Sequence, residues 1–210
     1  MSRVRLLIFD IDLTICDNFE RKRRSLERAL GRTFTNREWR RVKYRYGFRA
    51  VLKELQPDKP PSAILSISKR ILHHFFYDDD LFQFDKPFPR AVETLRQLAD
   101  EGYIISYLTG RPIRRTAEDF LRKYRFPEGR LLNEKVSLGQ SHKKVRLMKR
   151  MLRELNVSPE ETIAVGDLPD DAEAAKEAGI RAVCTLESRG FDEYYLRSIC
   201  DETIRKITEL

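Results

Sequence analysis

The chain has 210 residues, of which 41% are hydrophobic and 35% charged, and its net charge is +8. Such a chain can bury a substantial core beneath a heavily charged surface. No apolar run approaches the roughly 20 residues that cross a bilayer, and Asp10 and Asp12 interrupt the one stretch that could resemble a signal peptide. We therefore expect a cytoplasmic protein without a membrane partner.

The three cysteines are Cys16, Cys184 and Cys200, which are widely spaced and form no C-x-x-C pattern. Scattered cysteines of odd number are typical of buried thiols in a reducing compartment. We expect three free thiols that neither bind a metal nor act as nucleophiles.

The first predicted element is an apolar run at residues 6–9, which ends in Asp10 and Asp12. A continuous apolar run of this length predicts a strand that is buried on both faces of a parallel sheet. Ligands of such sheets bind beyond the carboxyl ends of the strands. Two carboxylates at that place repel each other, so we expect them to hold a cation, share a proton or receive a metal-bound phosphate.

Residues 16–84 have a wholly helical pattern, including a capping box at residues 35–38. Between residues 21 and 53 there are 13 basic residues and two acids, Glu27 and Glu38. A basic helical segment is either a solvated face or a surface that meets phosphates, and the sequence leaves both open. We expect residues 16–84 to form a helical domain inserted into a core.

From residue 87 onward, predicted strands and helices alternate. Residues 104–108 and 162–165 are predicted strands, and residues 141–155 are a predicted helix. A further helix is expected over residues 112–124, with a proline at its first position. This alternation predicts an α/β fold, a doubly wound three-layer parallel sheet. The core would comprise residues 1–15 and 85–210.

Polar motifs stand where these elements begin or end. In chain order they are Asp10-x-Asp12-x-Thr14, Thr109-Gly110-Arg111, Lys143-Lys144 and Gly166-Asp167-x-x-x-Asp171. The ordered set resembles the four motifs of the haloacid dehalogenase superfamily, and the helical insertion is similar to the cap domain of many members. The resemblance implies a hydrolase with a Rossmann-type core, of the phosphoglycolate phosphatase branch.

In this resemblance Asp10 attacks phosphorus and forms an aspartyl-phosphate. Asp12 protonates the leaving oxygen and then takes a proton from the hydrolytic water. A halide would leave without protonation, whereas an alkoxide is a poor leaving group. The presence of Asp12 therefore favours phosphate ester hydrolysis over dehalogenation.

The resemblance also implies the binding residues. The phosphoryl oxygens would be held by Thr109, Gly110 and Lys144. The expected cofactor is Mg²⁺, held by the side chains of Asp10, Asp167 and Asp171 and by the backbone carbonyl of Asp12. Carboxylate and carbonyl oxygens are the ligands that Mg²⁺ prefers.

Some assignments within the motifs stay open. Lys143 is an alternative to Lys144, although counting back from the helix end favours Lys144. Asp170 neighbours Asp171, and the spacing favours Asp171 as the metal ligand.

Two further positions depart from the common pattern or have no assigned role. Leu13 stands where the family often has glycine, which affects the turn after Asp12. Arg111 could pair with a core carboxylate, reach the substrate or lie in solvent.

The favoured function is hydrolysis of a small anionic phosphorylated metabolite. A phosphoryl mutase is one alternative, and a nucleic-acid or nucleotide terminal phosphatase that uses the basic helices is another. The complete set of acids disfavours a binding module without catalysis. The sequence leaves the substrate and the oligomeric state open.

Overall fold

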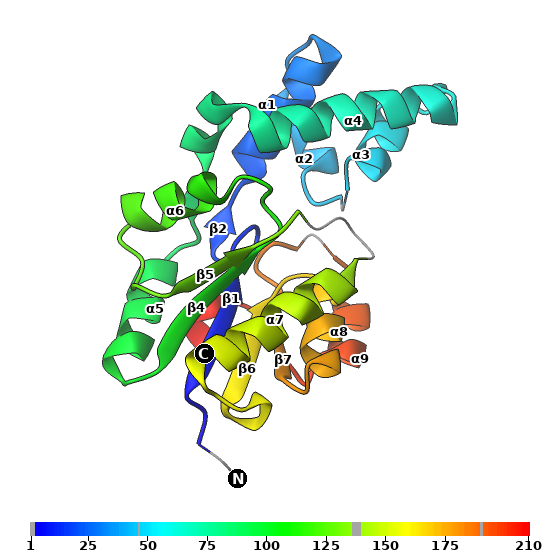
Figure 1. Ribbon diagram of the computed structural model, residues 1–210. Helices are drawn as coiled ribbons and strands as arrows, with labels where there is room; N and C mark the ends of the chain where they lie inside the picture. Colours follow the sequence, from blue (N-terminus) through cyan, green and yellow to red (C-terminus); the bar gives the residue numbers. More distant parts are fainter. Residues whose placement is uncertain (1–2, 46, 136–139, 190) are drawn as a thin grey trace. The chain divides into compact units, whose positions relative to one another are not determined.

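The structure is a computed structural model, and it describes residues 3–45, 47–135, 140–189 and 191–210 (Figure 1). The chain divides into two compact units. The core unit comprises Met1–Asp17 and Pro87–Leu210, and the helical insertion comprises Asn18–Lys86. Within the described ranges, no helix has the length and apolar character needed to cross a membrane.

A six-stranded sheet forms the centre of the core unit. Its strand order is β5-β4-β1-β6-β7-β8, and each neighbouring pair is parallel. The strands are β1 (Leu6–Asp10), β4 (Ile104–Thr109), β5 (Arg130–Asn133), β6 (Thr162–Gly166), β7 (Arg181–Thr185) and β8 (Glu202–Ile204). β4 and β5 lie on one side of β1, whereas β6, β7 and β8, which come later in the sequence, lie on the other side. The predicted doubly wound parallel sheet is therefore confirmed, and β1 lies at its switch point.

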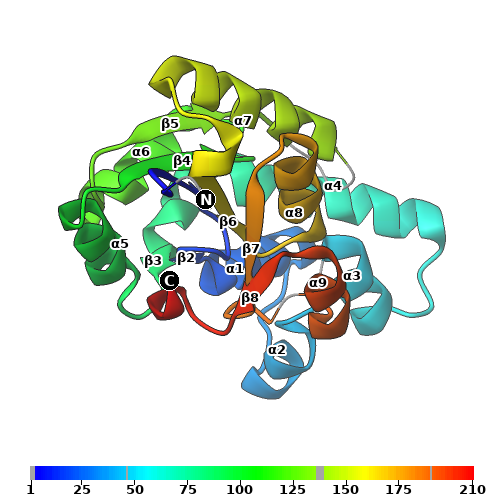
Figure 2. The ribbon, with the colours of Figure 1, turned by 90° about the horizontal axis from the view of Figure 1, so that it is seen from below.

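Helices cover both faces of this sheet (Figure 2). One face is packed by α5 (Ala91–Asp100) and α6 (Arg114–Lys123), and the other by α7 (Ser141–Leu155), α8 (Pro169–Glu177) and α9 (Glu193–Ile199). Two short 3-10 helices are η2 (Pro159–Glu161) and η3 (Ile207–Glu209).

The alternation of side chains along β1 explains the two layers. Leu6 and Ile8 belong to the apolar cluster of α7, α8 and α9, whereas Leu7 and Phe9 belong to that of α5 and α6. Successive strand residues point to opposite faces. A run that is apolar on every position thus requires helices on both sides.

The bounds of α7 agree with the prediction, but those of α6 do not. Pro112 was expected to begin this helix, whereas α6 begins at Arg114 after an extended Ile113. The residues before the helix form a separate turn, in which the backbone N–H of Arg111 donates to Thr109 Oγ1 at 3.2 Å. The helix therefore starts once this turn is complete.

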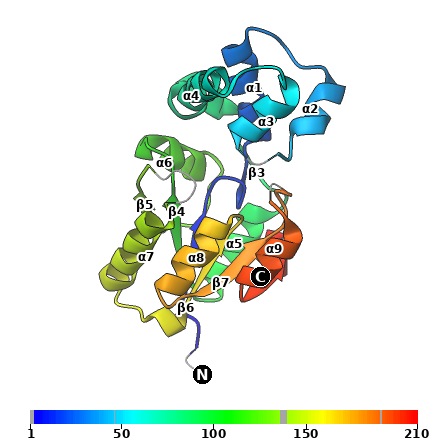
Figure 3. The same cartoon turned by 90° about the vertical axis from the view of Figure 1, so that its right-hand side faces the viewer.

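In the described part of the helical insertion, the chain forms the helices labelled α1 to α4 (Figure 3) and a 3-10 helix. They are α1 (Phe19–Leu30), α2 (Asn36–Val42), α3 (Phe48–Leu55), α4 (Pro61–Tyr77) and the 3-10 helix η1 (Asp79–Phe84). Two short strands, β2 (Cys16–Asp17) and β3 (Lys86–Pro87), lie at the connections to the core unit. The predicted capping box is present in α2, where the backbone N–H of Glu38 donates to Thr35 Oγ1 at 3.2 Å.

A buried arginine lies at the centre of the insertion. Arg21 is 0% exposed, and its guanidinium lies 4.1 Å from the centre of the Phe75 ring and 4.5 Å from that of Phe82. Its Nε lies 3.0 Å from Asp85 Oδ1. Burial of a charge is costly unless it is paired, so the acid and the two rings compensate for it.

Other arginines of the basic segment form ion pairs within the insertion. The pairs are Arg23–Glu27, Arg24–Glu20, Arg28–Asp78, Arg28–Asp80, Arg32–Glu38, Arg41–Glu54 and Arg45–Glu54. Several of these acids lie beyond residue 53, outside the stretch where the basic excess was counted. The fold thus brings negative charge to a segment that is strongly basic in sequence.

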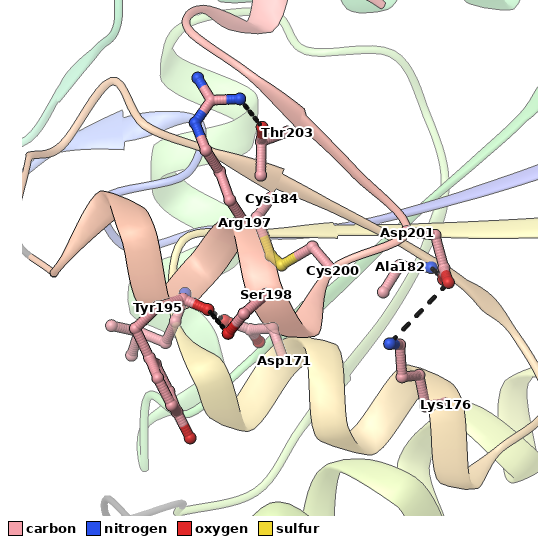
Figure 4. Close-up of a disulfide and its surroundings, with 11 residues drawn as sticks. Asp171, Lys176, Ala182, Cys184, Tyr195, Arg197, Ser198, Cys200, Asp201 and Thr203 are labelled. Atoms are coloured by element: carbon pink, nitrogen blue, oxygen red, sulfur yellow. Dashed lines mark hydrogen bonds and ion pairs between the residues drawn. A yellow bond between two sulfur atoms is a disulfide. The ribbon is translucent and has the colours of Figure 1, made fainter.

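The expectation of three free thiols is wrong for two cysteines. Cys184, in β7, and Cys200, directly after α9, form a disulfide (Figure 4). Their Cα atoms lie 6.1 Å apart, within the range that a disulfide spans. Cys16 is buried and keeps its thiol, as expected. The sequence pattern missed the disulfide because the fold, and not a short motif, brings the pair together.

Candidate active site

The predicted motifs meet at the carboxyl edge of the sheet. Asp10 ends β1 beside Leu108 of β4, and Thr109 is the last residue of β4. Gly166 ends β6 on the other side of β1. Gly110 directly follows Thr109. These residues therefore lie at the switch point of the sheet, where α/β proteins bind ligands.

Three carboxylates gather at this edge. Asp10, Asp167 and Asp171 each offer an oxygen, and these oxygens lie within 4.8 Å of one another. All three residues are buried, with exposed fractions of 8%, 1% and 5%. A buried set of hard oxygen donors is suited to Mg²⁺. The residues present thus fit the cofactor that the sequence predicted.

The electrostatics of the cluster favour a cation. Burial raises the pKa of Asp10 to about 7, with Lys144 opposing the shift and Asp171 adding to it. Burial and the neighbouring Asp10 likewise raise the pKa of Asp167 well above its usual range. Both shifts arise because burial and the neighbouring acids disfavour the charged carboxylates, and a bound divalent cation would offset this cost.

Lys144 lies inside the cluster. Its Nζ is 3.2 Å from Asp10 Oδ1, and it also donates to Asp171. Burial opposes the charge of Lys144, but the two carboxylates raise the pKa of its ammonium above the usual value. Lys143, in contrast, donates to the backbone carbonyl of Lys135 at 3.0 Å. Of the two predicted alternatives, the structure places Lys144 beside the acids.

Asp171 contacts both the start of its own helix and the lysine of the carboxylate cluster. Its Oδ2 accepts from the backbone N–H of Leu168 at 3.2 Å and so caps α8, while its Oδ1 faces Lys144. Gly166 makes room for this carboxyl, because a Cβ there would lie 2.4 Å from Asp171 Cβ and Cγ. Asp170 is buried, but among the described residues the three-acid cluster contains Asp171 instead.

Asp12 lies two residues beyond Asp10 and is held by Arg111. The Nε and Nη2 atoms of Arg111 donate to the two carboxylate oxygens of Asp12 at 2.9 Å and 2.7 Å. Of the roles left open for Arg111, the structure shows pairing with a core carboxylate. Leu13 has a φ of 64°, so the turn after Asp12 has the left-handed backbone that glycine usually adopts.

Two hydroxyl groups support Asp167. Ser188 Oγ donates to Asp167 Oδ2 at 3.1 Å, and Thr14 Oγ1 lies 3.4 Å from Asp167 Oδ1. Thr14 belongs to the first predicted motif, whereas Ser188 belongs to no motif and was not predicted. The available signal was its position shortly after β7, at the same edge of the sheet.

The comparison with family models decides the family. Residues 4–179 match a family described as "Hydrolase: haloacid dehalogenase-like hydrolase". The chain belongs to this family. The expectations of the family, the fold class and a hydrolytic enzyme are thereby confirmed.

Two curated relatives of this haloacid dehalogenase-like hydrolase carry a phosphatase name. Both are named glyceraldehyde 3-phosphate phosphatase. The relative from Methanopyrus kandleri is 25% identical and the alignment covers 86% of this chain and 83% of the relative. The relative from Pyrococcus furiosus is 27% identical, with 87% and 81% covered. The names agree with the expectation of a phosphoric monoester hydrolase.

A solved structure supports the fold. A haloacid dehalogenase-like hydrolase from Streptococcus pneumoniae superposes with a TM-score of 0.71. It is 19% identical, and the alignment covers 100% of this chain and 97% of the other. At this identity the likeness establishes the architecture and not the substrate.

Proposed function

We propose that this protein is a Mg²⁺-dependent phosphatase that hydrolyses a small phosphorylated metabolite through an aspartyl-phosphate on Asp10. The observation that carries the proposal is the buried cluster of Asp10, Asp167 and Asp171 around Lys144, at the switch point of the sheet. This arrangement combines a nucleophile, a metal-binding set and a cation for phosphate in one place. The names of the two curated relatives support the same reaction class.

In the first half-reaction, Asp10 attacks phosphorus and the leaving oxygen departs with a proton from Asp12. Lys144 and the Thr109 hydroxyl bind the non-bridging oxygens, over which transition-state charge is spread. When bound, Mg²⁺ neutralises the carboxylates and polarises the phosphoryl group. In the second half-reaction, Asp12 takes a proton from the water that attacks the aspartyl-phosphate.

In this proposal the predicted helical domain, residues 16–84, acts as a cap that excludes water and selects the substrate. Closure over a site strengthens electrostatic interactions and protects an intermediate from side reactions. The core residues perform the chemistry, so the insertion would change KM for different substrates more than it changes kcat. The class of substrate is a small phosphate monoester, in line with the relatives' names.

The test is a panel of phosphate monoesters, including glyceraldehyde 3-phosphate, phosphoglycolate, sugar phosphates, a 5′-phosphorylated oligonucleotide and p-nitrophenyl phosphate. We expect turnover of small esters that EDTA abolishes and Mg²⁺ restores. Asp10→Asn, which keeps the size of the side chain, should lower turnover by more than about a thousandfold. Full activity of this variant, or release of phosphate without any divalent cation, would overturn the proposal.

A matched pair of variants tests the metal set. Asp171→Asn should raise the Mg²⁺ concentration needed for half-maximal activity, because Asp171 belongs to the carboxylate cluster. Asp170→Asn, at the neighbouring buried position, should leave that concentration near its wild-type value. The reverse ranking would assign the metal to Asp170.

A further inference from the structure

The turn after β4 buries an arginine beside the proposed acid–base residue. Arg111 is 0% exposed, and its Nε and Nη2 donate to the two carboxylate oxygens of Asp12. Two N–H···O bonds from one planar guanidinium fix the position and the plane of a carboxylate. A lysine at this place could supply the charge but not the plane.

The guanidinium is anchored independently of Asp12. Its Nη1 donates to the backbone carbonyl of Thr116 at 3.1 Å, within α6. The backbone of Arg111 is held as well, since its N–H donates to Thr109 Oγ1 and its carbonyl accepts from Asn133 Nδ2 at 3.2 Å. These anchors come from the end of β4, the end of β5 and α6, so Asp12 is the partner that is positioned.

The two side chains differ in access to solvent. The side chain of Arg111 is 0% exposed, whereas that of Asp12 keeps 24% of its surface exposed. Arg111 is therefore not presented to a substrate, and a role as a solvated helix-start residue does not fit either. Asp12 can contact water on its exposed side, while the buried guanidinium of Arg111 fixes the orientation of its carboxylate.

We propose that Arg111 is a positioning residue that holds Asp12 as an oriented carboxylate for the hydrolysis of the aspartyl-phosphate. This inference rests on the proposed phosphatase function. It assigns Arg111 to one half of the reaction, the step in which Asp12 acts as a base.

The hydrolysis step exchanges one bond at phosphorus and moves one proton. The water oxygen forms a bond to phosphorus while the bond from phosphorus to the Asp10 carboxylate oxygen breaks, which restores free Asp10 and releases phosphate. The water proton passes to Asp12. Each carboxylate oxygen has a second lone pair, so Asp12 can accept this proton while it accepts from Arg111.

Rapid-quench kinetics with p-nitrophenyl phosphate and Mg²⁺ separates the two halves. p-Nitrophenolate needs little help from an acid, so the first half reports on Asp10, Lys144 and the metal. For Arg111→Gln we expect the rate constant for loss of the trapped phosphoenzyme to fall about tenfold to a hundredfold. The rate constant for p-nitrophenolate release should change much less. The phosphoenzyme should therefore accumulate during steady-state turnover.

Two further variants make the test decisive. Arg111→Lys keeps the buried charge, so it serves if Arg111→Gln does not fold, and we expect it to slow the same step by about tenfold because the bidentate contact is lost. Arg114→Gln is the control, because Arg114 is exposed and pairs with Glu118. Equal slowing of both halves in the folded Arg111 variants, or no slowing of either, would overturn the inference. Absence of any phosphoenzyme in the active wild type would instead overturn the proposed mechanism.

Discussion

Lys144 places a single ammonium between the carboxylates of Asp10 and Asp171. It offsets part of their mutual repulsion, and in the proposed function it also binds a phosphoryl oxygen. We expect Lys144→Ala to lower kcat/KM by about a hundredfold to a thousandfold, the usual cost of removing one electrostatic contact to a transition state. Lys143→Ala is the matched control and should be close to wild type, since its amine contacts the backbone of Lys135. Steady-state kinetics of the pair checks this, and a larger loss in Lys143→Ala would contradict it.

Gly166 is required by the close approach of Asp171. A methyl group at Gly166 would meet the Cβ and Cγ of Asp171, which cannot move without the first turn of α8. We predict that Gly166→Ala weakens Mg²⁺ binding by at least about tenfold, because displaced ligand geometry typically costs this much. Titration calorimetry with Mg²⁺ measures the effect.

Gly129→Ala is a control that distinguishes an effect on Mg²⁺ binding from an effect on the stability of the fold. Its Cβ would lie 2.3 Å from the backbone oxygen of Ile105, within the sheet and away from the acids. This variant should lower the melting temperature more than Gly166→Ala does. Equal Mg²⁺ affinity in Gly166→Ala and wild type would show that α8 absorbs the methyl group.

Individual site residues were predictable where a motif carries them. Asp10, Asp12 and Asp167 follow apolar runs, and the spacing favoured Asp171 over Asp170. The partner of Arg111 was not predictable, because Asp12 lies 99 residues away in sequence. Ser188 was missed for the same reason, since its contact with Asp167 spans 21 residues and belongs to no short pattern.

At the scale of elements, Lys22 links α1 to the end of α2. Its Nζ donates to the backbone carbonyls of Lys43 and Arg45 at 3.1 Å and 2.6 Å. Burial lowers the pKa of Lys22 from 10.5 to about 8. The ammonium thus satisfies two carbonyls while its own charge is poorly solvated.

This shift predicts a pH dependence of stability. Between pH 8 and pH 10.5 the folded chain binds fewer protons at Lys22 than the unfolded chain, so the free energy of unfolding should rise with pH in that window. Below pH 8 the destabilising contribution of this group is fully present. Urea unfolding of wild type and Lys22→Met across the window should give a difference that changes with pH. Exposed Lys53→Met is the control, and a flat difference for Lys22→Met would contradict the prediction.

Strong local signals made most elements predictable. The capping box marked α2, and the apolar stripe of residues 141–155 marked α7. In contrast, α9 and β8 were not predicted, because β8 has three residues at the edge of the sheet and Leu196 is the buried residue of α9. Short elements at the edge of a sheet have too few apolar residues for a hydrophobic periodicity to be recognised in the sequence.

At the scale of the whole molecule, the net charge of +8 does not by itself make a nucleic-acid surface. Arginines of α1 and α2 pair with carboxylates of the insertion, so phosphates would have to displace these acids. We predict weak binding of a single-stranded oligonucleotide at about 0.15 M salt, with a shallow dependence of affinity on salt. Fluorescence anisotropy over a salt series measures both quantities.

A charge-removal variant provides the comparison. Glu54 pairs with Arg41 and Arg45, so Glu54→Gln should raise oligonucleotide affinity and steepen its salt dependence. Tight binding by the wild type with a steep slope would revive the terminal nucleic-acid phosphatase as the better function. Hydrolysis of small esters alone would not distinguish a small-metabolite phosphatase from a terminal nucleic-acid phosphatase.

The disulfide between Cys184 and Cys200 has a consequence for which parts of the molecule can open separately. It joins β7 to the end of α9, next to the point where Asp201 exchanges backbone and side-chain hydrogen bonds with Ala182 (Figure 4). Closing a loop of this length stabilises a folded chain by about 3 kcal/mol. In the oxidised protein, amide hydrogens of α9 and β8 should therefore exchange only when the whole core unit unfolds. After reduction these two elements should exchange faster, as a unit of their own, while β1 and β4 keep their protection. Mass spectrometry of deuterium uptake in both redox states checks this, and uniform acceleration across the sheet would mean that the cross-link secures the entire core and not its edge.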